Sequence, residues 1–177
     1  MNVTGCFARV LVVVALAAEW SCGTRAQADS VYTSIRPADC TAPLKETAAP
    51  YAARDLGVQQ CPAPSGLRLL LVASDANTWI DLAGPGVTWS GERPIVYESP
   101  IGNFPSVGAS QTVEWRRDGR GQPTALIFQV TAQDRDTLQA HRSILYVVRV
   151  QQDRACVIGR AATNEEARAL ADSSKVC

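Results

Sequence analysis

The most strand-like part of the sequence is SILYVVRVQ, which runs from Ser143 to Gln151. β-Branched and aromatic residues favour strands, and successive side chains of a strand point to opposite faces of the sheet. Residues 144, 146, 148 and 150 then share one apolar face, whereas Arg149 lies on the other face beside Leu145 and Val147. This stretch therefore predicts a strand with one wholly apolar face.

The segments on either side of this stretch have a similar β-like composition. Thr112–Arg117 and Thr124–Thr131 precede it and are separated by a turn that contains Asp118-Gly119. An Asp-Gly pair between two β-rich segments is typical of a hairpin. Ala155–Ala161 follows after a polar turn at residues 152–153. These four segments predict an antiparallel meander.

The first half of the chain adds further strands. Leu67–Ala73 is apolar on both faces, as a central strand would be. Asn77–Leu82 follows after a short connection and predicts a hairpin with it. Two shorter strands are expected at residues 31–33 and 58–60. Prolines and glycine break the sequence between these two, which predicts a loop there.

Residues 84–110 interrupt this β pattern. They contain five glycines and four prolines. A loop of this length within one domain is uncommon and is usually either functional or mobile. We therefore regard residues 84–110 as a candidate functional loop.

The end of the sequence predicts a helix. Thr163 and Glu166 have the spacing of a capping box, in which each side chain accepts a hydrogen bond from the other residue's backbone N–H. Ala167, Leu170 and Ala171 then form a narrow apolar stripe. The predicted fold class is α+β: a mainly antiparallel β-sheet of about six strands with one C-terminal helix, cross-linked by disulfides.

The first 28 residues have the pattern of a secretory signal peptide. Arg9 precedes the apolar segment Val10–Ala18, and Ala26-Gln27-Ala28 is a small-x-small cleavage site. Nine apolar residues are too few to span a bilayer, which takes about 20. We expect residues 1–28 to be removed and residues 29–177 to form a single secreted globular domain, with no membrane insertion after cleavage.

The cysteines fit an exported protein. Four of the six cysteines lie after the predicted cleavage site, and disulfides form in oxidising compartments. Four cysteines allow three pairings. The favoured pairing is Cys40 with Cys61 and Cys156 with Cys177, because each bond closes a local loop of about 20 residues.

The charge of the predicted mature chain argues against nucleic-acid binding. Without Arg9, Arg25 and Glu19, the 17 basic and 17 acidic residues fall to 15 and 16. Nucleic-acid-binding domains usually carry a clustered basic excess. We therefore expect no nucleic-acid partner.

The sequence shows no catalytic motif of a common type. His141 is the only histidine, so a His-rich zinc site is excluded. Asp134, Asp136 and His141 have side chains that suit several divalent metals, but a polar connection between two strands explains them better. We predict no metal site and no cofactor.

Glu114 and Arg116 form the sharpest polar cluster. On a strand, Trp115 would face the core with Val113, and the two charged side chains would share the opposite face. Such a pair either recognises a polar ligand or is an ordinary ion pair on a wet sheet face. Glu114 is also the first candidate for a general acid or base. The possible second carboxylates for a glycan hydrolase are Asp75, Asp81, Glu92 and Glu98.

Four aromatic residues lie in or near the glycine- and proline-rich segment: Trp79, Trp89, Tyr97 and Phe104. Exposed aromatic rings beside a loop can stack on sugars or anchor a protein partner. The tryptophans can equally well fill the core. With Glu114 and Arg116, these four residues make up the predicted binding set.

A resemblance supports the export prediction. The order of landmarks runs from Val31-Tyr32-Thr33 through Cys40, Cys61 and Thr112–Arg116 to Cys156, Ala169–Asp172 and Cys177. This order resembles that of small exported proteins of Gram-negative bacteria whose function is uncharacterised. The resemblance implies a periplasmic location and two local disulfides, and it implies no activity.

These observations favour a non-catalytic periplasmic or secreted binding module whose partner is an envelope protein or a glycan. The alternative is a carboxylate-dependent cell-wall or glycan hydrolase, with Glu114 as its first catalytic candidate. A purely structural envelope component is a third reading.

Overall fold

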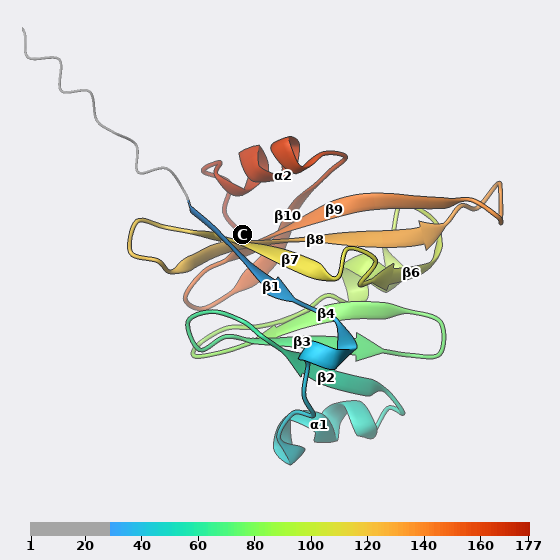
Figure 1. Ribbon diagram of the computed structural model, residues 1–177, viewed down its shortest axis with the longest axis horizontal. Helices are drawn as coiled ribbons and strands as arrows, with labels where there is room; N and C mark the ends of the chain where they lie inside the picture. The colour runs from blue at the N-terminus through green and yellow to red at the C-terminus, as the bar shows by residue number, and fades with distance from the viewer. Residues whose placement is uncertain (1–28) are drawn as a thin grey trace, which may run out of the picture.

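The computed structural model describes residues 29–177, and its strands form two antiparallel sheets that lie face to face (Figure 1). The predicted signal peptide, residues 1–28, lies outside the described residues. Helix α2 covers the outer face of one sheet, and helix α1 lies on the far side of the other. The α+β fold class is confirmed, although the strands are divided over two sheets and α1 is an additional helix.

The larger sheet has six strands. Its continuous order is β1 (Asp29–Ser34), β7 (Thr112–Arg117), β8 (Pro123–Gln133), β9 (His141–Val150) and β10 (Ala155–Ala161). The segment β7–β10 is the predicted meander. Strand β6 (Asn103–Val107) pairs with the end of β8 that lies beyond β7.

The smaller sheet has the order β2 (Gly57–Cys61), β3 (Arg68–Ala73), β4 (Thr78–Ala83) and β5 (Thr88–Ser90). The predicted hairpin of β3 and β4 is confirmed. The core between the sheets takes residues from both of them, including Leu69 and Leu82 from the smaller sheet and Trp115 and Phe128 from the larger one. A second, smaller apolar cluster lies between the larger sheet and α2.

Two segments predicted as loops contain regular structure. Helix α1 (Lys45–Ala52) forms despite Pro50, which lies near its C-terminal end, where the missing backbone N–H removes only one helical hydrogen bond. The segment 84–110 contains β5, a π-helical segment η2 (Glu92–Tyr97) and β6. These elements are short, and β5 and β6 form by pairing with β4 and β8, so their local sequence does not reveal them.

Both predicted disulfides are present. Cys40–Cys61 joins the short 3₁₀ segment η1 (Pro37–Asp39) to the end of β2. Cys156–Cys177 joins β10 to the C-terminal residue. No helix within residues 29–177 is both long and apolar enough to cross a membrane.

The predicted helix is α2 (Asn164–Ala171), and its capping box is confirmed. The backbone N–H of Glu166 donates to the Thr163 hydroxyl, and the Glu166 carboxylate accepts from the backbone N–H of Thr163. Ala167 and Ala171 are buried against the larger sheet. The helix is eight residues long, so it covers only part of the sheet's outer face.

Candidate functional site: a groove beside the C-terminal helix

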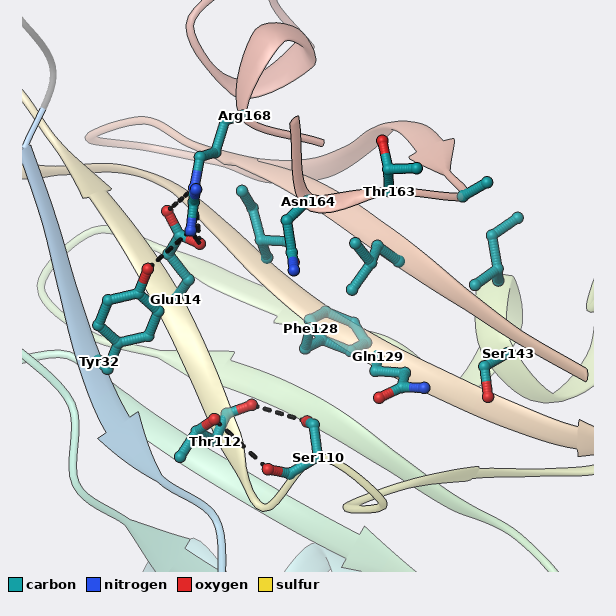
Figure 2. Close-up of a pocket in the computed structure, with 14 residues that line it drawn as sticks. Tyr32, Ser110, Thr112, Glu114, Phe128, Gln129, Ser143, Thr163, Asn164 and Arg168 are labelled. Atoms are coloured by element: carbon teal, nitrogen blue, oxygen red, sulfur yellow. Dashed lines mark hydrogen bonds and ion pairs between the residues drawn. The ribbon is translucent and has the colours of Figure 1, made fainter. Parts of the chain in front are cut away.

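Helix α2 leaves part of the larger sheet's outer face uncovered, and this part forms a groove of about 580 Å³. Strand pairing places Glu114 of β7 beside Ile127 of β8, and Gln129 of β8 beside Leu145 of β9. The first residues of α2 form one side of the groove (Figure 2). The complete lining is Tyr32, Ser110, Thr112, Glu114, Ile127, Phe128, Gln129, Ser143, Ile144, Leu145, Ala162, Thr163, Asn164 and Arg168.

An ion pair between α2 and β7 closes one end of the groove. Arg168 Nε lies 2.9 Å from Glu114 Oε1, and Arg168 Nη2 lies 3.0 Å from Glu114 Oε2. The same Nη2 donates to the Tyr32 hydroxyl at 2.8 Å, as Figure 2 shows. The Ser30 hydroxyl donates a further hydrogen bond of 2.5 Å to Glu114.

A second ion pair lies directly behind the first. Arg116 donates through Nε and Nη2 to the two carboxylate oxygens of Asp172, at 3.0 and 2.6 Å. Arg116 Nη1 is also 3.6 Å from Glu114 Oε1. The four charges of Glu114, Arg168, Arg116 and Asp172 therefore balance within one network.

This network keeps Glu114 ionised. Burial raises the pKa of Glu114, but the hydrogen bonds from Arg168 and Ser30 and the charges of Arg168 and Arg116 outweigh burial, so its pKa is lowered. The pKa of Arg168 is raised by its hydrogen bonds to the same carboxylate. Glu114 is thus a fixed anion with its oxygens already occupied.

The groove also contains two uncommitted carboxamides. The side chain of Asn164 extends from the start of α2 toward β8, where Gln129 lies (Figure 2). Neither side chain hydrogen-bonds to any other residue in the part of the chain that the structure describes. The hydroxyls of Thr112 and Ser143 flank Gln129, and the partly buried Leu145 supplies apolar surface.

The predicted strand pattern around Trp115 is confirmed. Val113 and Trp115 lie in the core between the sheets, whereas Glu114 and Arg116 face α2. This face is not the wet sheet surface of the ordinary ion-pair reading, since Glu114 is only 5% exposed. The sequence could not show this, because the covering helix lies more than 50 residues further along the chain.

The structure does not bring the six predicted binding residues together. Trp79 is buried on β4 beside Val72, and Trp89 pairs with Leu82 on the opposite face of the same sheet. Tyr97 is exposed at the end of η2. Phe104 is exposed on β6 and lines a different cavity from the groove that Glu114 lines.

The possible metal-binding residues form a turn instead. The backbone N–H groups of Asp136 and Thr137 donate to Asp134 Oδ1 at 2.8 and 3.0 Å. Asp134 also forms an ion pair with Arg142. Within residues 29–177, no three His, Cys, Asp or Glu side chains lie close enough together to hold a metal ion.

Sequence reasoning missed Gln129, Asn164 and Arg168. Two local signals point to them. Gln129 is the one amide side chain in the apolar run of residues 125–130. Asn164 and Arg168 are four residues apart on a helix and therefore share a face. What remained hidden was that this face meets β7 and β8.

Comparisons with protein-family models, with curated proteins and with solved structures give no match. The chain's family is therefore not shown, and its resemblance to exported bacterial proteins stays a prediction.

Proposed function

We propose that the protein is a non-catalytic binding module of the bacterial periplasm and that its groove holds an uncharged glycan segment. The main support for this proposal is that the carboxamides of Gln129 and Asn164 have no hydrogen-bond partner within residues 29–177, in a groove whose charged side chains are all paired. A carboxamide offers both a donor and an acceptor, which suits hydroxyl and acetamido groups.

The charge balance of the groove favours a neutral ligand. Glu114 and Arg168 neutralise each other, as do Arg116 and Asp172. An anionic ligand would have to compete with Glu114 for Arg168, which already donates to both of its oxygens. Binding a neutral ligand leaves this network intact.

The shape of the groove and its mixed surface also support a sugar ligand. Ligand sites are concave and combine apolar surface with a few placed polar groups. Leu145, which is partly buried, provides an apolar patch for the C–H face of a sugar ring, and Tyr32 is 55% exposed at one end. The Arg168 hydrogen bond to the Tyr32 hydroxyl holds the tyrosine ring in place.

The geometry gives less support to the alternative, a glycan hydrolase. Hydrolysis by paired carboxylates needs one protonated acid and a second carboxylate across the cleft. The pKa of Glu114 is lowered, which disfavours the acid role. Glu114 is also the only acidic residue lining the groove within residues 29–177.

The periplasmic location rests on the predicted signal peptide and on the two disulfides. Disulfides persist in oxidising compartments such as the periplasm. Both bonds of the structure close local loops, and Cys156–Cys177 ties the last residue to β10.

Calorimetric titration with a neutral oligosaccharide of N-acetylated sugars tests the proposal. We expect binding that weakens at least tenfold in Gln129→Leu and in Asn164→Ala. Gln152→Leu, an exposed glutamine outside the groove, is the matched control and should bind as the wild type does. Product analysis of the same mixtures should show the oligosaccharide intact.

Two outcomes would contradict the proposal. Cleavage of the oligosaccharide that disappears in Glu114→Gln would show a hydrolase. Absence of glycan binding, together with capture of an envelope protein that Gln129→Leu abolishes, would show that the groove binds a protein surface.

A further inference from the structure

A second cavity, of about 540 Å³, lies where the two sheets meet at the end away from the groove's ion pair. Ile35, which follows β1, and Leu71 of β3 contribute apolar side chains to it. Val107 of β6 lines it as well, and the exposed ring of Phe104 stands beside them. The lining therefore combines residues of both sheets.

The hydroxyls of Thr78 and Ser106 inside this cavity already have hydrogen-bond partners. The Thr78 hydroxyl lies 3.0 Å from the Ser106 hydroxyl and donates to the backbone oxygen of Val107 at 3.0 Å. The backbone N–H of Val107 donates to Thr78 Oγ1 at 2.7 Å. These bonds join the sheets and leave an interior that offers mainly apolar contact to a ligand.

Phe104 is the unusual residue of this cavity. Its φ of 50° lies in the left-handed region, which is a genuine outlier for a bulky side chain. A conformation of this kind is energetically costly and tends to occur at ligand sites. The ring is 59% exposed, so its burial in the free protein does not offset that cost.

The rim of the cavity has a basic character. Arg36 and His141 line it, and no acidic side chain does so among the residues that the structure describes. Arg36 Nε is held by Asp39 at 2.7 Å. Its two terminal nitrogens make no hydrogen bond within residues 29–177 and remain available to an anion.

We propose that this cavity binds a single-chain amphiphile with an anionic head, such as a fatty acid. The acyl chain lies against Leu71, Val107 and the ring of Phe104. The carboxylate lies at the rim, where the terminal nitrogens of Arg36 and the imidazole of His141 bind it. This site is separate from the groove, and the proposal does not depend on glycan binding.

His141 gives a site-specific measurement, because it is the only histidine of the chain. We would titrate the wild-type protein with decanoate below its micelle concentration and follow the imidazole NMR signals. Saturable shifts are expected with decanoate and not with acetate, which has the head group without the chain. Failure of decanoate to shift these signals, or equal shifts with acetate, would overturn the proposal.

Variants test the two halves of the ligand. Phe104→Ala should weaken decanoate binding at least tenfold, whereas Tyr97→Ala, an exposed aromatic residue outside the cavity, should change it less than twofold. Arg36→Gln should weaken binding of decanoate about fivefold and leave binding of decanol, the uncharged analogue, unchanged. Wild-type affinity in Phe104→Ala would overturn the site, and wild-type affinity in Arg36→Gln would overturn the placement of the head group.

Discussion

Arg168 of α2 and Glu114 of β7 are 54 residues apart in the sequence, yet Arg168 donates hydrogen bonds to both oxygens of the Glu114 carboxylate. Glu114 is buried, whereas the Arg168 side chain is 42% exposed. The pair therefore joins the C-terminal helix to the sheet and forms the end wall of the groove.

Breaking this pair should destabilise the protein. We expect Glu114→Gln to lower the free energy of unfolding by about 2 kcal/mol, because hydrogen bonds to charged groups are worth more than neutral ones and Gln accepts fewer of them. A double-mutant cycle with Arg168→Met should give a coupling energy of about 1–2 kcal/mol, which is below the value for a fully buried pair. Urea denaturation measures both. A coupling near zero would show that the Glu114–Arg168 pair does not help to hold α2 on the sheet.

The same carboxylate should make stability depend on pH. The pKa of Glu114 is lowered below its ordinary value of 4.5, so the folded state binds its proton less tightly than the unfolded state. Its contribution is fully present above pH 4.5 and is lost as the pH falls through the folded-state pKa. The stability difference between wild type and Glu114→Gln should thus be constant near neutral pH and shrink in acid.

Urea titrations between pH 7 and pH 3 check this. The exposed Glu165 of α2 supplies the matched control, because Glu165→Gln removes a charge that has no ion-pair partner within residues 29–177. If the difference in unfolding free energy between wild type and Glu114→Gln grew larger in acid, the prediction would be wrong.

Arg149 should hold the C-terminal tail. It is buried on β9 and donates to the backbone oxygens of Ala171, Ser173 and Lys175 at 2.9, 2.8 and 2.9 Å. Lysine keeps the charge but lacks the planar fork that reaches three acceptors. Arg149→Lys should therefore cost about 2 kcal/mol and speed amide exchange at Ser173.

Arg154, in the turn between β9 and β10, provides a control for the Arg149 substitution. Arg154 is paired with Asp153 at the surface, so Arg154→Lys should change stability by less than about 0.5 kcal/mol. Equal effects of the two substitutions would show that the tail is held by the Cys156–Cys177 disulfide alone.

The hydroxyl of Tyr51 should stabilise the attachment of α1. It donates to Asp81 Oδ2 at 2.8 Å, and Asp81 also accepts from the Ser90 hydroxyl and from the backbone N–H of Gly91. Burial raises the pKa of Asp81 and also raises that of Tyr51. Tyr51→Phe removes one donor from a buried carboxyl group and should cost about 1.5 kcal/mol in thermal or urea unfolding. An unchanged unfolding free energy would contradict this role.

Gly102 should tolerate no side chain. Its φ is 155°, and a Cβ atom there would overlap the backbone oxygen of Gln133 on the paired strand β8. Gly66 also has a positive φ, of 73°, but nothing lies within 4 Å of its Cβ position. Gly66→Ala should cost about 1 kcal/mol, and Gly102→Ala should cost clearly more, since β6 must shift. Equal costs in urea unfolding would show that β6 is loosely held.

The local features of the fold can be predicted from the sequence alone. Alternation of apolar side chains predicted strands β7 to β10 and assigned Trp115 and Glu114 to opposite faces. The Thr163 and Glu166 spacing predicted the start of α2, and the short loops between cysteines predicted both disulfides. Each of these signals depends on residues within one element or one short loop, so each can be read without knowing the rest of the fold.

Where these elements meet depends on packing between distant segments of the chain. The division into two sheets, the pairing of β6 with the far end of β8 and the placement of α2 over Glu114 all bring together residues that are far apart in the chain. The groove exists because α2 is too short to cover the whole sheet face, and its carboxamides come from β8 and α2. Periodicity gives the face on which a side chain lies, whereas packing between distant segments chooses what that face meets.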